Sequence, residues 1–152
     1  MKLAGVIYDV VNAYDGTAIE IYLSGCNRKC FGCHSPELQD YSFGTEIDGV
    51  GLRTLISGIT ENQAFADIIS FLGGDPLQQD NERFAQLVGV LQLMFPDKKY
   101  WLFTGEDDIE KIPKWIWKNF DTVKVGSYKE ELRQSGFPAS SNQKILRKGV
   151  DF

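Results

Sequence analysis

The chain contains few of the residues that stabilise small secreted proteins or anchor membrane proteins. Among its 152 residues there are three cysteines and one histidine. An odd number of cysteines cannot all pair within one chain. No apolar run reaches about 18 residues, the length of a membrane-spanning helix, and the opening MKLAGVIYDV does not resemble a secretory signal. These absences predict a cytoplasmic protein with reduced thiols and no membrane segment.

The chain also lacks an excess of positive charge. Its formal net charge is −5, which argues against general affinity for nucleic acids or anionic membranes. Hydrophobic residues make up 43% and aromatic residues 12%, so the chain can bury a core. We find no repeats or linker-like segments, and the length suits one domain that covers residues 1–152.

Strand and helix patterns alternate along the chain. Strands are expected over residues 3–11, 18–23, 66–72, 99–103 and 122–125. Helices are expected over residues 36–39, 49–59, 81–95 and 108–120. Residues 12–17 have the composition of a turn, and a short strand is possible in the irregular tail after Gly126.

This alternation favours an α/β fold with mostly parallel strands joined by right-handed crossovers. A closed eight-stranded barrel needs about 250 residues, so we expect an incomplete, TIM-like α/β barrel or an open, curved α/β sheet. The cysteine segment, the Gly73–Pro76 turn and Thr104–Gly105 each follow a predicted strand. Because ligands gather at the carboxyl ends of parallel strands, all three segments are expected at one functional edge.

The three cysteines, Cys26, Cys30 and Cys33, form a single C-x3-C-x2-C motif. Spacings this short would strain a disulfide, whereas three thiolates on one loop suit a metal cluster. A [4Fe–4S] cluster that receives three cysteines keeps one iron free for a small molecule, much as a catalytic zinc keeps an open position. A structural zinc site completed by His34 is the alternative, although adjacent Cys and His residues seldom reach the same ion.

The cysteine motif resembles the signature of the radical S-adenosylmethionine enzymes. The turn Gly73-Gly74-Asp75-Pro76 follows a predicted strand about forty residues later and is similar to the Gly-Gly-acidic-Pro turn of that family. In the family, the backbone of this turn meets the methionine amino group, and glycine permits the close approach.

Within this superfamily the whole chain resembles the activating proteins of anaerobic ribonucleoside-triphosphate reductase. The motif ends in Phe31-Gly32-Cys33, similar to their Pro-Gly-Cys. Residues 10–26 resemble their opening segment and 102–105 their strand that ends in Tyr-Thr-Gly. Residues 140–145, SSNQKI, are similar to their closing Ser-x-Asn-Gln-Arg-Ile segment.

The resemblance implies that the chain generates a glycyl radical in a partner reductase. Its implied cofactors are a [4Fe–4S] cluster and S-adenosylmethionine, and its implied partners are the reductase and an electron donor such as flavodoxin. The residues implied to bind the cluster, and to be catalytic through it, are Cys26, Cys30 and Cys33. The residues implied to bind S-adenosylmethionine are Gly32, Cys33, His34, Gly73 and Gly74.

Two positions depart from the family pattern. Glu106 replaces a common aromatic residue, and Val125 occupies the place of an aspartate. Two other functions stay open at this point. One is a different small radical S-adenosylmethionine enzyme, either an activase of another glycyl radical enzyme or a protein similar to deazaguanine synthase. The other is a metal-stabilised interaction module without enzymatic activity.

Overall fold

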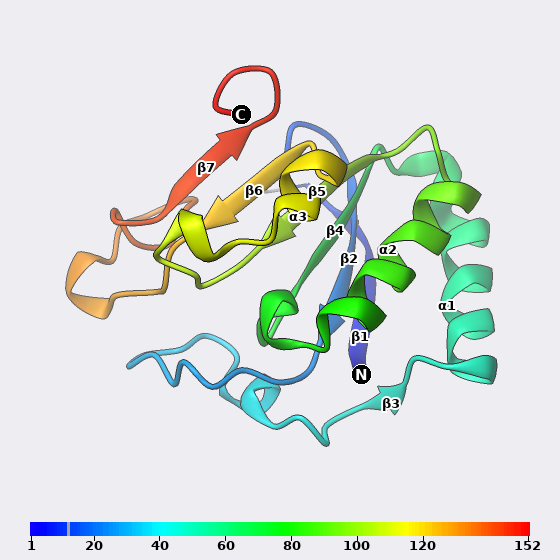
Figure 1. Ribbon diagram of the computed structural model, residues 1–152, viewed down its shortest axis with the longest axis horizontal. Coiled ribbons are helices and arrows are strands. Elements are labelled where there is room, and N and C mark those ends of the chain that lie inside the picture. Colours follow the sequence, from blue (N-terminus) through cyan, green and yellow to red (C-terminus); the bar gives the residue numbers. More distant parts are fainter. Residues whose placement is uncertain (12) are drawn as a thin grey trace.

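The computed structural model describes residues 1–11 and 13–152 and contains one seven-stranded sheet (Figure 1). Its strands are β1 (Lys2–Val10), β2 (Ala18–Leu23), β3 (Thr45–Glu46), β4 (Ile68–Gly73), β5 (Lys99–Phe103), β6 (Thr122–Val125) and β7 (Lys144–Arg147). Their order across the sheet is β3-β1-β2-β4-β5-β6-β7.

The central strands of the sheet run in one direction. The neighbours β2, β4, β5 and β6 are parallel, whereas β1 and β7 are antiparallel to the strands beside them. Since β3 is antiparallel to β1, it runs in the same direction as β2. The sheet is therefore mostly parallel, and it is open, with β3 and β7 as its edges.

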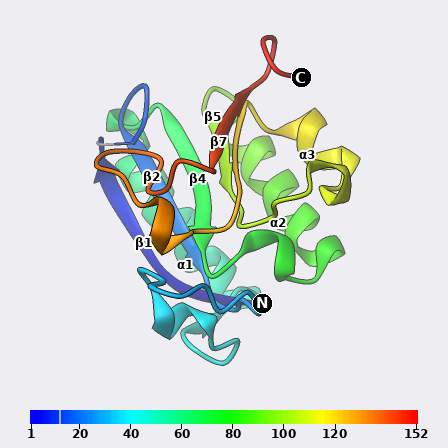
Figure 2. The ribbon, with the colours of Figure 1, turned by 90° about the vertical axis from the view of Figure 1, so that its left-hand side faces the viewer.

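Three α-helices connect the parallel strands and cover the same face of the sheet (Figures 1 and 2). They are α1 (Gly49–Asn62), α2 (Asn81–Met94) and α3 (Lys114–Asn119). Their buried side chains share one core with alternate residues of the strands, including Leu55, Phe84, Ile116, Ile21, Phe71 and Leu102. Within the described residues, none of the helices is long and apolar enough to cross a membrane.

Five short 3-10 helices complete the described secondary structure. They are η1 (Pro36–Gln39), η2 (Gln63–Phe65), η3 (Pro76–Gln78), η4 (Ile109–Lys111) and η5 (Glu130–Leu132). The helix expected over residues 108–120 is wrong in its extent, because the structure has η4 and α3 there instead. Ile112 precedes Pro113 and is extended, as residues before proline usually are, so the helix cannot continue through this point.

The strand predictions agree closely with the structure. The expected limits of β2, β5 and β6 are those observed, and the short strand in the tail is β7. Only β3, two residues long, was not anticipated. Asn12, the first residue of the turn expected over residues 12–17, lies outside the described residues.

The sheet face opposite the helices is partly polar. Glu20 is buried there, and its carboxylate accepts hydrogen bonds of 2.6 Å from both Tyr14 and Tyr22. Tyr14 also packs on Trp101 and Phe103, with ring centroids 4.9 and 5.8 Å away. Burial, reinforced by the bond to Glu20, raises the pKa of Tyr14 above its ordinary value of 10.0.

This arrangement predicts a loss of stability at alkaline pH. The folded protein binds the Tyr14 proton more tightly than the unfolded chain does. The contribution of Tyr14 to the free energy of unfolding is therefore complete below about pH 10 and decreases above it. Between about pH 9 and pH 11, this residue alone should lower the free energy of unfolding by about 1 kcal/mol. Urea unfolding of the Tyr14→Phe variant should show a shallower decline over this range. An identical decline in both proteins would contradict the assignment.

Candidate functional site

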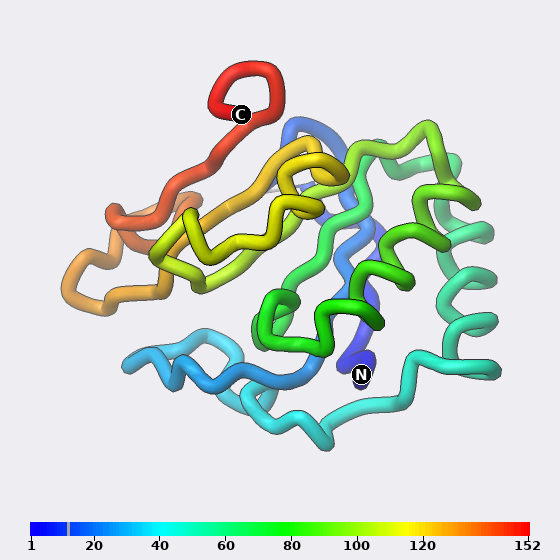
Figure 3. Tube along the Cα trace, viewed as in Figure 1, coloured from blue at the N-terminus to red at the C-terminus, as the bar shows by residue number. Residues whose placement is uncertain are grey.

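Four strand ends enclose a cavity of about 300 Å³. Cys26 lies shortly after the end of β2, and Gly74, Thr104 and Gly126 directly follow β4, β5 and β6. Because these four strands are parallel, their carboxyl ends lie at the same edge of the sheet, as the sequence predicts. The tube drawing shows the cysteine loop, residues 26–33, below this edge and the segment after β6 beside it (Figure 3).

The cavity contains most of the residues that the sequence singled out. Its lining includes the expected site residues Cys26, Cys30, Cys33, His34, Gly73 and Gly74. Gly32 is not part of this lining. It has a φ of +75°, and a Cβ atom there would lie 2.5 Å from Oε2 of Glu130, so Gly32 faces η5 instead.

The three cysteines are free thiols and are half-buried. Burial raises the pKa of the Cys26 thiol, and the charge of Asp75 acts in the same direction, while a backbone hydrogen bond from Arg28 opposes them. Within the described residues, no three His, Cys, Asp or Glu side chains are arranged to hold a single metal ion. A four-iron cluster takes its thiolates on different irons, so its ligands need not converge on one point.

Glycines set the cysteine loop close to the Gly73–Gly74 turn. Gly25 donates a hydrogen bond of 2.7 Å to the carbonyl of Leu38, and Asp75 donates one of 3.0 Å to the carbonyl of Gly25. A Cβ atom at Gly74 would lie 2.5 Å from both of these carbonyl oxygens. Gly73, at φ +121°, has a backbone conformation that favours glycine. The glycine turn therefore supports the base of the cysteine loop as well as lining the cavity.

Asp75 is a central residue of the site whose role was not predicted from the sequence. Its side chain is 1% exposed and accepts hydrogen bonds from Thr104 Oγ1 and the Gly105 amide, each 2.9 Å long. The Leu77 amide donates a further bond of 2.9 Å. Asp75 thus joins the ends of β4 and β5. The acidic residue of the Gly-Gly-acidic-Pro turn was a signal, but its partners depend on strand order.

A lysine side chain lies on the β6 side of the cavity. Lys124 is half-buried, and its Nζ atom is 5.7 Å from the centre of the Phe103 ring. Burial lowers the pKa of Lys124 to about 8, although the negative charges of Asp75 and Cys30 act in the opposite direction. This side chain therefore offers the cavity a positive charge, or a neutral amine at higher pH.

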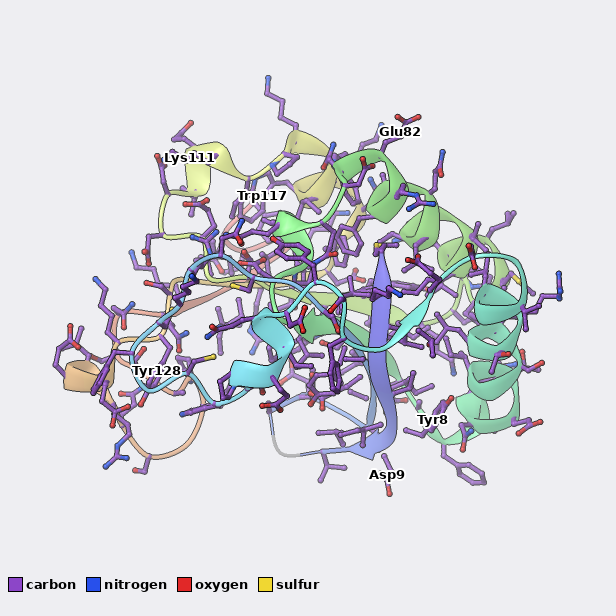
Figure 4. The ribbon with its side chains drawn as sticks, turned by 90° about the horizontal axis from the view of Figure 1, so that it is seen from below. Tyr8, Asp9, Glu82, Lys111, Trp117 and Tyr128 are labelled. Carbon is purple, nitrogen blue, oxygen red and sulfur yellow. The ribbon has the colours of Figure 1, made fainter. Side chains whose placement is uncertain are left out.

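The segment after β6 forms the outer wall of the site. The rings of His34 and Tyr128 are 4.7 Å apart, and Tyr128 hydrogen-bonds to Glu130. Figure 4 labels Tyr128 at the side of the molecule where this segment approaches the cysteine loop. The contact between His34 and Tyr128 joins residues far apart in the sequence, which explains why sequence patterns did not identify Tyr128.

The SSNQKI segment holds this wall in place. Gln143 is buried, donates a hydrogen bond of 3.0 Å to the Gly126 carbonyl and accepts one of 3.2 Å from the Ser140 amide. Asn142 donates a bond of 2.8 Å to the carbonyl of Ser127. The side chains of the segment therefore anchor the chain as it leaves β6, and Gln143 also lines the cavity.

The donor set fits a thiolate-bound cluster with an adjoining polar ligand. Three reduced thiols from one short loop line a cavity that also exposes glycine backbone and a lysine. Thiolates are the protein ligands of iron–sulfur clusters, and glycines leave room for a ligand near the backbone.

Comparison with known proteins agrees with this chemistry. The chain is similar to the activating proteins of anaerobic ribonucleoside-triphosphate reductase from Haemophilus influenzae, with 28% identity over 91% of this chain and 92% of the relative. The corresponding protein of Enterobacteria phage T4 is 28% identical over 90% of this chain and 87% of the relative. That of Escherichia coli K12 is 25% identical over 90% and 92%.

These relatives confirm the resemblance seen in the sequence motifs. The family model described as a 4Fe-4S single cluster domain matches residues 14–146, which include every candidate site residue. Since the match covers most of the chain, the protein belongs to the 4Fe-4S single cluster domain family.

Proposed function

We propose that this protein activates an anaerobic ribonucleoside-triphosphate reductase as a radical S-adenosylmethionine enzyme. The observation that carries the proposal is the meeting of three free thiols and the Gly73–Gly74 turn in one cavity. The relatives named as activating proteins of that reductase support the choice of partner.

Cys26, Cys30 and Cys33 would hold a [4Fe–4S] cluster, and three ligands leave one of its four irons open to a small molecule. When bound, the cluster would supply the electron for reductive cleavage of S-adenosylmethionine, the chemistry from which a glycyl radical on the reductase would result. The protein itself contributes binding, orientation and exclusion of water.

The remaining candidate residues would bind S-adenosylmethionine. Gly73 and Gly74 present backbone without side chains, and Cys33 and His34 lie at the same cavity. We assign Gly32 to the same set because it adjoins Cys33 and His34, although a Cβ atom on Gly32 would point toward Glu130 and not into the cavity. The Lys124 ammonium group adds a charge that suits an anionic part of the ligand.

The open sheet suggests how a macromolecular substrate would take part. We propose that residues 1–152 form one domain that works as an incomplete barrel, with helices on one face and edges at β3 and β7. A docked reductase would cover the cavity and protect the radical from water. Reduced thiols suit the cytoplasm, where an external donor such as flavodoxin would supply the electron.

The decisive experiment is an anaerobic incubation of the purified protein with reductant, S-adenosylmethionine and the glycyl radical subunit of the reductase. We expect 5′-deoxyadenosine and an electron paramagnetic resonance signal from the reductase that requires all components. Turnover of a free metabolite without a protein partner would favour another small radical S-adenosylmethionine enzyme. A colourless, zinc-loaded protein without turnover would favour a non-enzymatic module.

A further inference from the structure

Arg28 connects the cysteine loop to the ends of two strands. It lies between the first two cysteines, and its Nε donates a hydrogen bond of 2.9 Å to Oδ2 of Asp75. Its Nη2 donates a second bond of 3.3 Å to Oε2 of Glu106. A guanidinium group donates in fixed, divergent directions, so two anchored carboxylates define the position of the loop better than one.

Both carboxylates also accept hydrogen bonds from donors outside the cysteine loop. Asp75 is held by three donors from the ends of β4 and β5, as described above. Glu106 accepts a hydrogen bond of 3.0 Å from the Asp108 amide, and its own amide donates one of 3.1 Å to Oγ1 of Thr104. Because these bonds hold both carboxylates independently of the cysteine loop, Arg28 is attached to fixed positions on the sheet side.

Gly105 provides the space that Arg28 occupies. A Cβ atom at this position would lie 2.6 Å from Cδ and 2.9 Å from Nε of Arg28. The φ angle of Gly105 is not in the left-handed region, so the need at this position is for space. Gly105 and Glu106, next to each other after β5, therefore both complement one arginine in the cysteine loop.

The tip of the loop has few other supports. Asn27, Lys29 and Phe31 are exposed, and the Phe31 side chain is 84% exposed. The Asn27 amide donates to Gln78, and Cys33 donates back to Cys30. Arg28 is the charged residue of the tip that reaches the sheet.

We propose that Arg28 is a positioning residue that holds the cysteine loop in its binding geometry before a cluster is present, with Glu106 as its second anchor. The proposal rests on the proposed function in taking Cys26, Cys30 and Cys33 as cluster ligands. It also explains the departure at position 106, where a carboxylate that pairs with Arg28 replaces the common aromatic residue.

The test uses the full chain in two forms. In the cluster-free, reduced protein, hydrogen–deuterium exchange of residues 24–35 is followed by mass spectrometry. In the reconstituted protein, cluster loss to an iron chelator is followed by visible absorbance. The variants are Arg28→Met, Arg28→Lys and Glu106→Gln, with Arg53→Met as the control that makes the same substitution at an exposed arginine of α1 outside the cavity lining.

We expect Arg28→Met to accelerate both exchange and cluster loss by about tenfold, because Asp75 loses its buried partner and the loop loses its attachment. Glu106→Gln should accelerate both by about threefold, since one of the two anchors remains. Arg28→Lys should restore part of the protection because it keeps the charge near Asp75. Arg53→Met should match the unmodified protein.

The proposal is overturned if Arg28→Met and Glu106→Gln both behave like Arg53→Met in the cluster-free protein. If Arg28→Met does not fold, Glu106→Gln alone decides, since it leaves the pair between Arg28 and Asp75 intact. If the unmodified protein takes up no cluster, the proposed function fails, yet the exchange measurements still decide the role of Arg28.

Discussion

Alanine in place of any one of Cys26, Cys30 and Cys33 is expected to abolish 5′-deoxyadenosine formation and to lower iron content sharply. Each cysteine would supply one thiolate to a different iron, and the described residues offer no fourth cysteine as a replacement. Changes beyond the direct ligands of metal sites already cost 10- to 100-fold, so loss of a ligand should reduce activity by more than about 100-fold. Iron and sulfide analysis and chromatography of the nucleoside product measure both effects.

Phe31→Ala provides the matched control for the cysteine variants. Phe31 lies on the same loop, between Cys30 and Cys33, but its side chain is 84% exposed and does not line the cavity. We expect this variant to keep its cluster and to cleave S-adenosylmethionine in the absence of the reductase. Turnover retained by all three cysteine variants would refute the ligand assignment.

Gly74→Val is expected to cause the second large loss, because it disturbs the cysteine loop as well as the ligand. From the sequence, a side chain here should hinder S-adenosylmethionine and leave the cluster intact. The geometry changes that expectation, since a Cβ atom would lie 2.5 Å from the carbonyl oxygens of Gly25 and Leu38. Backbone has to move, so cluster content should fall together with binding, and overpacking should cost about 1–3 kcal/mol of stability.

Gly89→Ala separates this local effect from a general effect of replacing glycine. Gly89 lies in α2, and a Cβ atom there would meet nothing within 4 Å. Helix propensity should make this control more stable, by up to about 1 kcal/mol, with unchanged iron content. Iron analysis, ligand titration and thermal unfolding of both variants test the contrast. Weakened binding with full cluster content in Gly74→Val would show that the clash is relieved away from the cysteine loop.

Local sequence patterns predicted the elements whose limits are set by local residues. The strand over residues 18–23 ends before Ser24–Gly25, and that over 99–103 ends before Thr104–Gly105. The helix over 108–120 was predicted as one piece because Pro113 was assigned to its first turn, where proline is tolerated. The proline interrupts it because the residue before it is driven into an extended conformation.

The outer wall of the site was less predictable because its contacts join segments that are far apart in the sequence. Cysteine spacing and the Gly73–Pro76 turn identify two sides of the cavity from short motifs. Tyr128, by contrast, reaches His34 only because β6 lies in a particular place in the sheet. Glu106 was recognised as a departure from the family pattern. Its hydrogen bond to Arg28 could not be predicted, because it depends on the cysteine loop lying beside the segment after β5.

The distribution of the cavity lining along the chain bears on the timing of biosynthesis. The lining extends from Cys26 to Gln143, so a ribosome-bound chain that ends within α2 already carries every thiol but none of the wall from β6 onward. In such a nascent chain the sulfur atoms would be accessible to oxidants and stray metal ions. Iron delivery is therefore best matched to the stage at which β7 has joined the sheet edge.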